Sequence, residues 1–155
     1  MNRPEIISIL KNAPSFLEDL VSEIPEDLLK IKRRPSKWSI HENVCHLAEV
    51  HTMMIERFKM FKTEYNPIIK PYNPDTPDNY LMNQDFDDCL SRFRKDRKAM
   101  INILRAFTTD DWTNEGRHPE YIKFNAEIFL RHIMLHDQLH MYRIEELWLT
   151  KDEFL

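Results

Sequence analysis

The last long helical segment of the chain reads FNAEIFLRHIMLHDQLHMYRIEELWL, from Phe124 to Leu149. It contains His136 and His140, which are four residues apart and therefore share one face of a helix, about one turn from each other. Two imidazoles at this spacing can bind one metal ion. The spacing also arises by chance, so we expect a metal site only if a distant helix supplies a third histidine.

The composition is that of one globular domain. Of the 155 residues, 42% are hydrophobic and 31% are charged, and the formal net charge is −4. We therefore expect a single domain over residues 1–155. Charges of both signs are interspersed without a basic stripe, so we expect no nucleic-acid partner. No run approaches the ~20 apolar residues of a membrane span, and the first residues do not resemble a signal peptide, which predicts a cytoplasmic protein without a membrane partner.

Glycine and cysteine usage narrow the fold and the chemistry. Gly116 is the only glycine, which excludes a glycine-rich phosphate loop and Asn-Gly hairpins and so disfavours an all-β fold. Leu, Met, Glu, Lys and Arg are abundant, which favours helices. Cys45 and Cys89 match no zinc ribbon and no redox motif, and we interpret them as free buried thiols in a reducing compartment.

Helical periodicity predicts four long helices. The expected ranges are 2–24, with a kink or break at Pro14, then 39–63, 83–107 and 124–149. Ser39 and Glu42 have the spacing of a capping box at the start of the second range. The apolar seam expected on that range consists of Ile40, Val44, Leu47, Met54, Phe58 and Phe61. The last range is expected to pack on its neighbours through a seam of five residues: Ile128, Leu135, Leu139, Tyr142 and Leu147.

Two connectors separate these helices. Residues 66–78 hold four prolines, at positions 67, 71, 74 and 77, and should form an extended loop. Residues 108–123 form the other connector, which includes Trp112, Gly116 and Pro119. The sequence thus predicts an all-α fold: a four-helix bundle with long irregular loops between helices 2 and 3 and between helices 3 and 4.

The third metal ligand has to come from the remaining histidines. His41, His46 and His51 lie on the second predicted helix at steps of five, about 140° apart around its axis, so they cannot all face one site. Periodicity places His51 on the core seam and His46 at its flank, which slightly favours His51. His132 extends the stripe of the last helix, and His118 lies in a connector.

A zinc protease is the weaker interpretation of the same pair. The stretch from His136 to His140 has the spacing of that signature but carries Asp137 where the general base is a glutamate, and the shorter side chain reaches less far toward a metal-bound water. The stretch from His41 to His46 is one residue too long for the signature, so those two histidines diverge.

The order of motifs along the chain resembles that of a known family. Trp38-Ser39-Ile40 is followed by His46-Leu47-Ala48-Glu49, Lys70-Pro71-Tyr72, Arg117-His118-Pro119-Glu120 and the His136/His140 pair. From about Pro14 to Leu147 the chain resembles the DinB-like superfamily and, within it, the YfiT-like metal-dependent hydrolases. The resemblance implies a four-helix bundle that holds a divalent metal ion with three histidines.

Carried onto this sequence, the resemblance assigns the metal ligands to His46, His136 and His140, and so favours His46 over His51. Imidazole suits zinc, nickel, iron and copper alike, and we expect zinc or nickel, with zinc slightly ahead. The residues from Tyr121 to Phe124 stand where many members of the family have a glycine, which changes the loop that controls access to the site.

Three neutral imidazoles leave a divalent ion with an open position, where a metal-bound water could supply hydroxide or a thiolate could be activated. Glu49, three residues after His46, is the candidate general base or an anchor for a ligand, and an exposed acid on the helix surface is an equal interpretation. The resemblance adds His118 as a second catalytic candidate. Asp137 and Glu145 are weaker candidates.

These observations leave three functional hypotheses. The first is a metal-dependent enzyme that acts on a small-molecule substrate, either a hydrolase or a transferase that uses a low-molecular-weight thiol. The second is a non-catalytic metal- or ligand-binding module of a stress response. The third is a helical interaction protein whose histidines bind no metal. A homodimer is expected if the bundle leaves an apolar helix face exposed.

Overall fold

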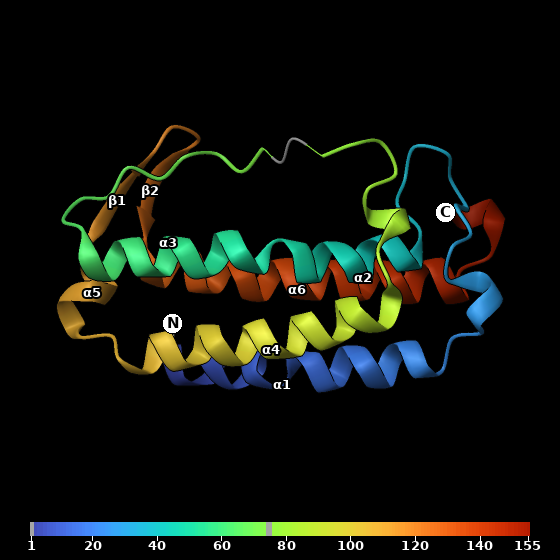
Figure 1. Cartoon of the computed structure of the whole chain (residues 1–155), viewed down its shortest axis with the longest axis horizontal. Helices are drawn as coiled ribbons and strands as arrows, with labels where there is room; N and C mark the ends of the chain where they lie inside the picture. Colours follow the sequence, from blue (N-terminus) through green and yellow to red (C-terminus); the bar gives the residue numbers. More distant parts are fainter. Residues whose placement is uncertain (1, 74–75) are drawn as a thin grey trace.

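The computed structural model describes residues 2–73 and 76–155, so Pro74 of the proline-rich connector lies outside the described residues. Its long helices lie side by side along one axis (Figure 1). The elements are α1 (Arg3–Ser22), α2 (Ile40–Glu49), α3 (His51–Thr63), α4 (Phe86–Arg105), α5 (Thr109–Thr113), β1 (Glu115–His118), β2 (Tyr121–Asn125) and α6 (Ala126–Leu149), with short 3-10 turns at Glu26–Leu28, Leu81–Asn83 and Asp152–Phe154.

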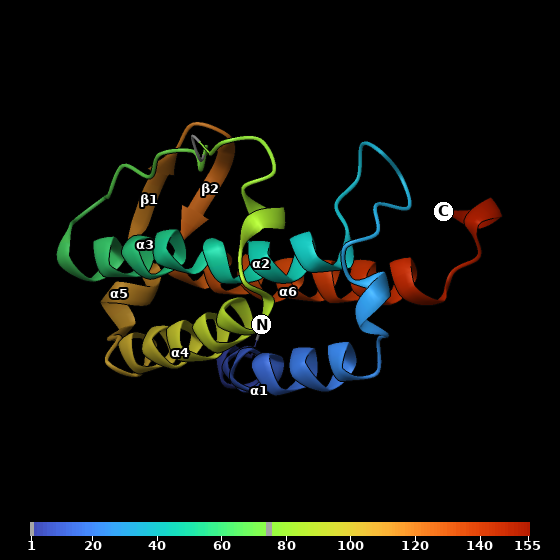
Figure 2. The ribbon, with the colours of Figure 1, turned by 45° about the vertical axis from the view of Figure 1, so that its right-hand side comes forward.

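The predicted four-helix bundle is confirmed, with α2 and α3 forming one of its four rods. This rod packs against α4 and α6, and α1 packs against the same two helices on the other side. The described parts of the connector after α3, residues 64–73 and 76–85, lie along α3 and α2 on the side where the β1–β2 hairpin also lies (Figures 1 and 2). Within the described residues, none of the helices combines the length and the apolar character needed to cross a membrane.

Pro14 does not end the first helix, contrary to the break that the sequence suggested. Proline removes one backbone donor, so the carbonyl of Leu10 loses its helical partner. Leu10 and Leu17, one turn before and after Pro14, are fully buried, and Pro14 itself is buried. Packing of this face therefore outweighs the lost hydrogen bond and keeps α1 continuous.

The second predicted helix is divided at Val50, although its capping box is confirmed. Ser39 accepts from the Glu42 backbone, and the Glu42 carboxylate accepts from the Ser39 N–H. At the junction, His51 Nδ1 donates to the Leu47 carbonyl over 2.8 Å. In a continuous helix that carbonyl would accept from the backbone N–H of His51, so the imidazole replaces one bond of the ladder and separates α2 from α3.

The connector after α4 is more ordered than the irregular loop that we predicted. Thr108 and Asp111 form a capping box for α5, and an antiparallel β1–β2 hairpin follows. Its register pairs Gly116 with Phe124. A Cβ at position 116 would lie only 3.0 Å from the Phe61 ring, so the single glycine lets the hairpin approach α3 closely.

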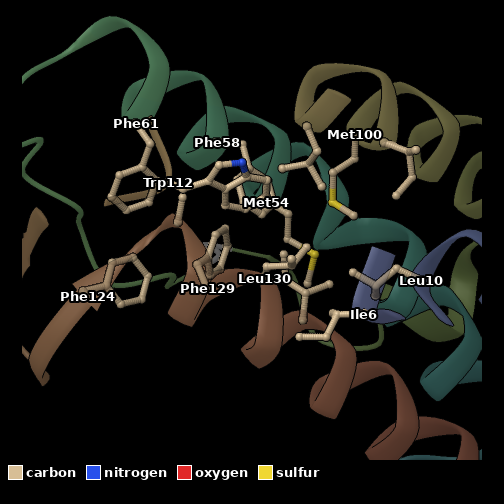
Figure 3. Close-up of a cluster of buried hydrophobic side chains, with 14 of the residues drawn as sticks. Ile6, Leu10, Met54, Phe58, Phe61, Met100, Trp112, Phe124, Phe129 and Leu130 are labelled. Atoms are coloured by element: carbon tan, nitrogen blue, oxygen red, sulfur yellow. The ribbon is translucent and has the colours of Figure 1, made fainter. Parts of the chain in front are cut away.

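The core consists of two apolar clusters along the bundle. The first lies at the α5 and hairpin end and includes Phe58, Phe61, Trp112 and Phe129 (Figure 3). The second, at the α2 end, is built from α1, α2, α4 and α6 around Leu17, Leu47, Phe93 and Ile144. Together they account for the seam predicted on the second helical range, from Ile40 to Phe61, which is buried.

The seam predicted for the last helix was wrong in part. Leu135, Leu139 and Tyr142 are 54%, 52% and 60% exposed, whereas Leu147 is buried. The core face of α6 is instead formed by Ala126, Phe129, Leu130, Ile133, Asp137, Met141, Ile144 and Leu147. Two apolar stripes with helical spacing compete on this helix, and the one that is buried includes a charged residue, which hid it from the periodicity argument.

A buried polar layer separates the two apolar clusters. His51 of α3, Arg97 of α4 and Asp137 of α6 are 0%, 1% and 2% exposed. Arg97 Nε donates to His51 Nε2 over 3.0 Å, and Arg97 Nη2 pairs with Asp137 Oδ2 at 2.6 Å. Because burial of unpaired charges is strongly unfavourable, this layer fixes how the three helices meet.

Burial of His51, reinforced by the charge of Arg97, lowers its pKa to about 4. Between pH 6.5 and pH 4 the unfolded chain therefore binds a proton that the folded chain does not, and the free energy of unfolding falls as the pH falls. The slope of the unfolding free energy against pH can be measured by urea denaturation with a metal chelator present. We expect His51→Gln to reduce this slope by about 1.4 kcal/mol per pH unit in that range. An unchanged slope would show that His51 is not held neutral in the folded chain.

Candidate metal centre

Three histidines from two helices meet at the α2–α6 contact. His46 lies on α2, and His136 and His140 lie one turn apart on α6. The Nε2 atoms of His46 and His136 are 3.2 Å apart, and one ring nitrogen from each of the three histidines lies within 4.8 Å of the other two. The structure thus brings together the pair from which the sequence argument began and the histidine that the family resemblance selected.

The geometry of the cluster fits a divalent ion. Zn–N bonds of about 2.0–2.1 Å in a tetrahedral site place two ligand nitrogens about 3.3 Å apart. The 3.2 Å between His46 Nε2 and His136 Nε2 already matches this separation, and small side-chain rotations suffice for the third nitrogen. A set of three imidazoles also leaves a fourth position for water or substrate, as catalytic zinc sites do.

The electrostatics keep two of these ligands, His46 and His140, neutral. Burial, and then the neighbouring imidazoles, lower the pKa of His46 to about 3. Burial and His136 likewise lower the pKa of His140 to about 4. At neutral pH both rings therefore keep an unprotonated nitrogen whose lone pair can bind a metal without first losing a proton.

Asn43 orients His140, a role that the sequence analysis missed. His140 Nδ1 donates to Asn43 Oδ1 over 2.8 Å, and the Asn43 amide donates to the Ser39 carbonyl at the start of α2. With Nδ1 engaged, Nε2 of His140 is the nitrogen available to the ion. The signal in the sequence was an asparagine three residues before His46, on the same side of α2.

An aromatic side chain and a cleft border the cluster. The Trp38 ring lies 4.6 Å from the His46 ring and stacks on His140 at 5.8 Å, measured between ring centroids. Beside His140 opens a cleft of about 440 Å³, lined among others by Asn43 and Leu139. Among the three candidate ligands this cleft is lined by His140, together with Trp38, and we take it as the candidate substrate pocket beside the cluster.

The two catalytic candidates lie outside the cluster. Glu49 Oε2 accepts a hydrogen bond from the Tyr80 hydroxyl at 3.2 Å and pairs with Arg92 at 3.7 Å. His118 is buried at the end of β1, where its Nδ1 accepts from the Glu120 backbone over 3.1 Å. Burial and the charge of Arg57 lower the pKa of His118, so its ring is neutral at pH 7.

His51 and His132, which were also considered from the sequence, do not join the cluster. His51, which periodicity favoured, has both ring nitrogens engaged, with the Leu47 carbonyl and with Arg97. His132 is exposed, and its ring stacks against that of His136 at a centroid distance of 6.5 Å. Periodicity located His51 correctly in the core, but core burial supplied it with protein partners in place of a metal.

Comparison with known proteins agrees with this description. Residues 9–144 match the DinB superfamily. A protein of Oceanobacillus iheyensis named "Putative metal-dependent hydrolase" is 26% identical over 149 residues, covering 96% of this chain and 87% of the relative. A Bacillus cereus protein of the same name is 27% identical over 118 residues, which are 74% of this chain and 66% of that relative.

Two solved structures share the fold. YfiT from Bacillus subtilis, described as "a probable metal-dependent hydrolase with an unusual four-helix bundle topology", aligns with a TM-score of 0.84 at 23% identity, over 95% of this chain and 87% of YfiT. A DinB-like protein from the same organism aligns with a TM-score of 0.60 at 16% identity, over 92% and 89% of the two chains. Since the family match spans most of the sequence, the chain belongs to the DinB superfamily.

Proposed function

We propose that this protein is a metal-dependent hydrolase whose divalent ion is held by His46, His136 and His140. The observation that carries the proposal is the convergence of three histidine rings from α2 and α6, with one ring nitrogen of each within 4.8 Å of the other two. The names of the relatives support the same class of reaction. Zinc is the metal that we favour over nickel, because a three-histidine site with one open position is an arrangement that catalytic zinc uses.

Each residue of the site has a separate role in this proposal. When bound, the ion acts as a Lewis acid and lowers the pKa of a coordinated water to about 7. Asn43 keeps His140 in the tautomer that presents Nε2. Trp38 covers two of the three ligand rings and excludes bulk water from that side. The cleft beside His140 holds a small-molecule substrate.

Glu49 is the proposed general base. Tyr80 and Arg92 hold its Oε2, which fixes the carboxylate and leaves Oε1 as the atom that we assign to proton transfer. His118 is proposed to donate to the substrate. A row of aromatic rings leads from His118 through Tyr121 and His132 to His136. Successive ring centroids in this row are 4.8, 6.1 and 6.5 Å apart, so a substrate that reaches both ends has to be extended.

Two alternatives use the same metal site. In a thiol transferase, a low-molecular-weight thiol takes the open position as a thiolate. In a non-catalytic module, the site binds a metal or ligand without turnover. The hydrolase is favoured over both because the relatives of this chain carry that description. A cytoplasmic location remains a prediction from the sequence.

The metal site is tested by metal content. Protein purified without a nickel column is expected to contain about one divalent ion per chain by mass spectrometry. His46→Ala, His136→Ala and His140→Ala should each lower zinc affinity by more than the ~10–100-fold that loss of an orienting group costs. His132→Ala, on the same helix, is the matched control and should bind as wild type does. Wild-type protein without stoichiometric metal and unable to take up zinc would contradict the proposal.

The hydrolase is tested by turnover. Esters and amides, and in parallel electrophiles paired with small thiols, should be screened with zinc-loaded protein. For an ester or amide that the wild-type protein hydrolyses, Glu49→Gln is expected to lower kcat ~100-fold to 10,000-fold, which is the usual contribution of a general base. Glu5→Gln, an exposed acid of α1, is the control. Equal rates for Glu49→Gln and wild type would remove Glu49 from the mechanism, and turnover only with a thiol would favour the transferase.

We also propose a homodimer through the exposed apolar stripe of α6, formed by Leu135, Leu139 and Tyr142. A soluble chain rarely leaves such a stripe uncovered. Sedimentation of the wild type is expected to give twice the chain mass, and Leu135→Glu should shift it to the monomer. Ile122→Glu, on the exposed hairpin, is the control that should stay dimeric. A monomeric wild type at micromolar concentration would rule the dimer out.

A further inference from the structure

A continuous set of polar contacts crosses the core from α2 to α6. It begins at the Leu47 carbonyl, which accepts from His51 Nδ1, and continues from His51 Nε2 to Arg97 Nε at 3.0 Å. Arg97 Nη2 then pairs with Asp137 Oδ2 at 2.6 Å. All three side chains are almost fully buried, so their partners can only be one another and the groups that surround them.

The set of contacts ends next to a candidate metal ligand. The other oxygen of the carboxylate, Asp137 Oδ1, lies 3.9 Å from His136 Nδ1. Both atoms are buried, and neither has a hydrogen-bond partner among the described residues. His136 Nε2 is the atom that faces His46 Nε2. The neutral ring carries its single hydrogen on one nitrogen only, so a hydrogen on Nδ1 is what frees Nε2 for an ion.

We propose that Asp137 is a positioning residue that orients His136 for metal binding, and that Arg97 and His51 hold its carboxylate in place. The proposal rests on the metal site proposed above. A ring rotation that shortens the 3.9 Å separation lets His136 Nδ1 donate to Asp137 Oδ1. The carboxylate then selects the tautomer and raises the basicity of the ligand, as acceptors behind metal-bound histidines do.

The ion pair is poorly explained by stability alone. A buried pair rarely stabilises a fold more than apolar residues of similar size would, because desolvation of two charges offsets their attraction. Arg97 and Asp137 nevertheless occupy core positions between two apolar clusters. His140 offers a parallel, since its Nδ1 already donates to a buried acceptor, Asn43. Each α6 ligand thus has a protein acceptor beside the nitrogen that faces away from the ion.

The test measures metal affinity separately from folding. Asp137→Asn keeps the size of the side chain but removes its charge, and it is expected to weaken zinc binding ~10–100-fold in a chelator competition. The absorption spectrum of the cobalt-loaded protein should also change, because the orientation of His136 changes. Arg97→Lys keeps the charge but cannot bond His51 and Asp137 together, and its affinity should lie between those of Asp137→Asn and wild type.

Met100→Ala is the matched control, since Met100 is buried on α4 one turn after Arg97. It should lower the melting temperature of the metal-free protein and leave zinc affinity and the cobalt spectrum as in wild type. Folding of each variant is followed by circular dichroism. If Asp137→Asn does not fold, the zinc affinity of Arg97→Lys decides the test. Wild-type affinity in a folded Asp137→Asn or Arg97→Lys protein would overturn the positioning role and leave the metal site standing. Failure of wild type itself to bind zinc would remove the site and this role together.

Discussion

The ion pair between Arg97 and Asp137 is the constraint on which the packing of this bundle depends. A buried guanidinium and a buried carboxylate must lie at the same level along the bundle axis, because either charge left unpaired in the core is strongly unfavourable. Arg97 also bonds His51, so the same height is imposed on α3. The layer therefore sets the relative positions of α3, α4 and α6, and the clusters on either side fill the remaining space.

The position of the candidate metal site follows from that constraint. His136 and Asp137 are adjacent in sequence and therefore point about 100° apart around α6. With Asp137 held in the core by Arg97, His136 must face the groove between α6 and α2, and His140 follows it one turn later. His46 meets them there because α2 crosses α6 at the same height. A polar group buried in the core thus determines where ligands on another face point.

The sequence was sufficient for features that depend on one helix. The seam from Ile40 to Phe61, the capping box at Ser39 and the spacing of His136 and His140 are local patterns, and each appears in the structure. Features that depend on two helices were not predictable. Leu135 and Leu139 are as apolar as Ile133 and Met141, and only the neighbouring helices decide which stripe is covered. Periodicity alone slightly favoured His51 over His46 as the third ligand, because it could not show the partner that engages His51, which lies on another helix, α4.

The junction at Val50 links a local feature, the end of α2, to the contacts between helices. His51 starts α3, and its side chain donates to the carbonyl of Leu47, which is the residue after His46 in the last turn of α2. The other ring nitrogen of His51 accepts from Arg97, which pairs with Asp137 of α6. Both helices that carry the candidate ligands are therefore tied to one buried network, which holds them together before any ion arrives. Since His46 and His140 are neutral at neutral pH, an incoming ion meets ligands that are already close and unprotonated, and little reorganisation opposes its binding.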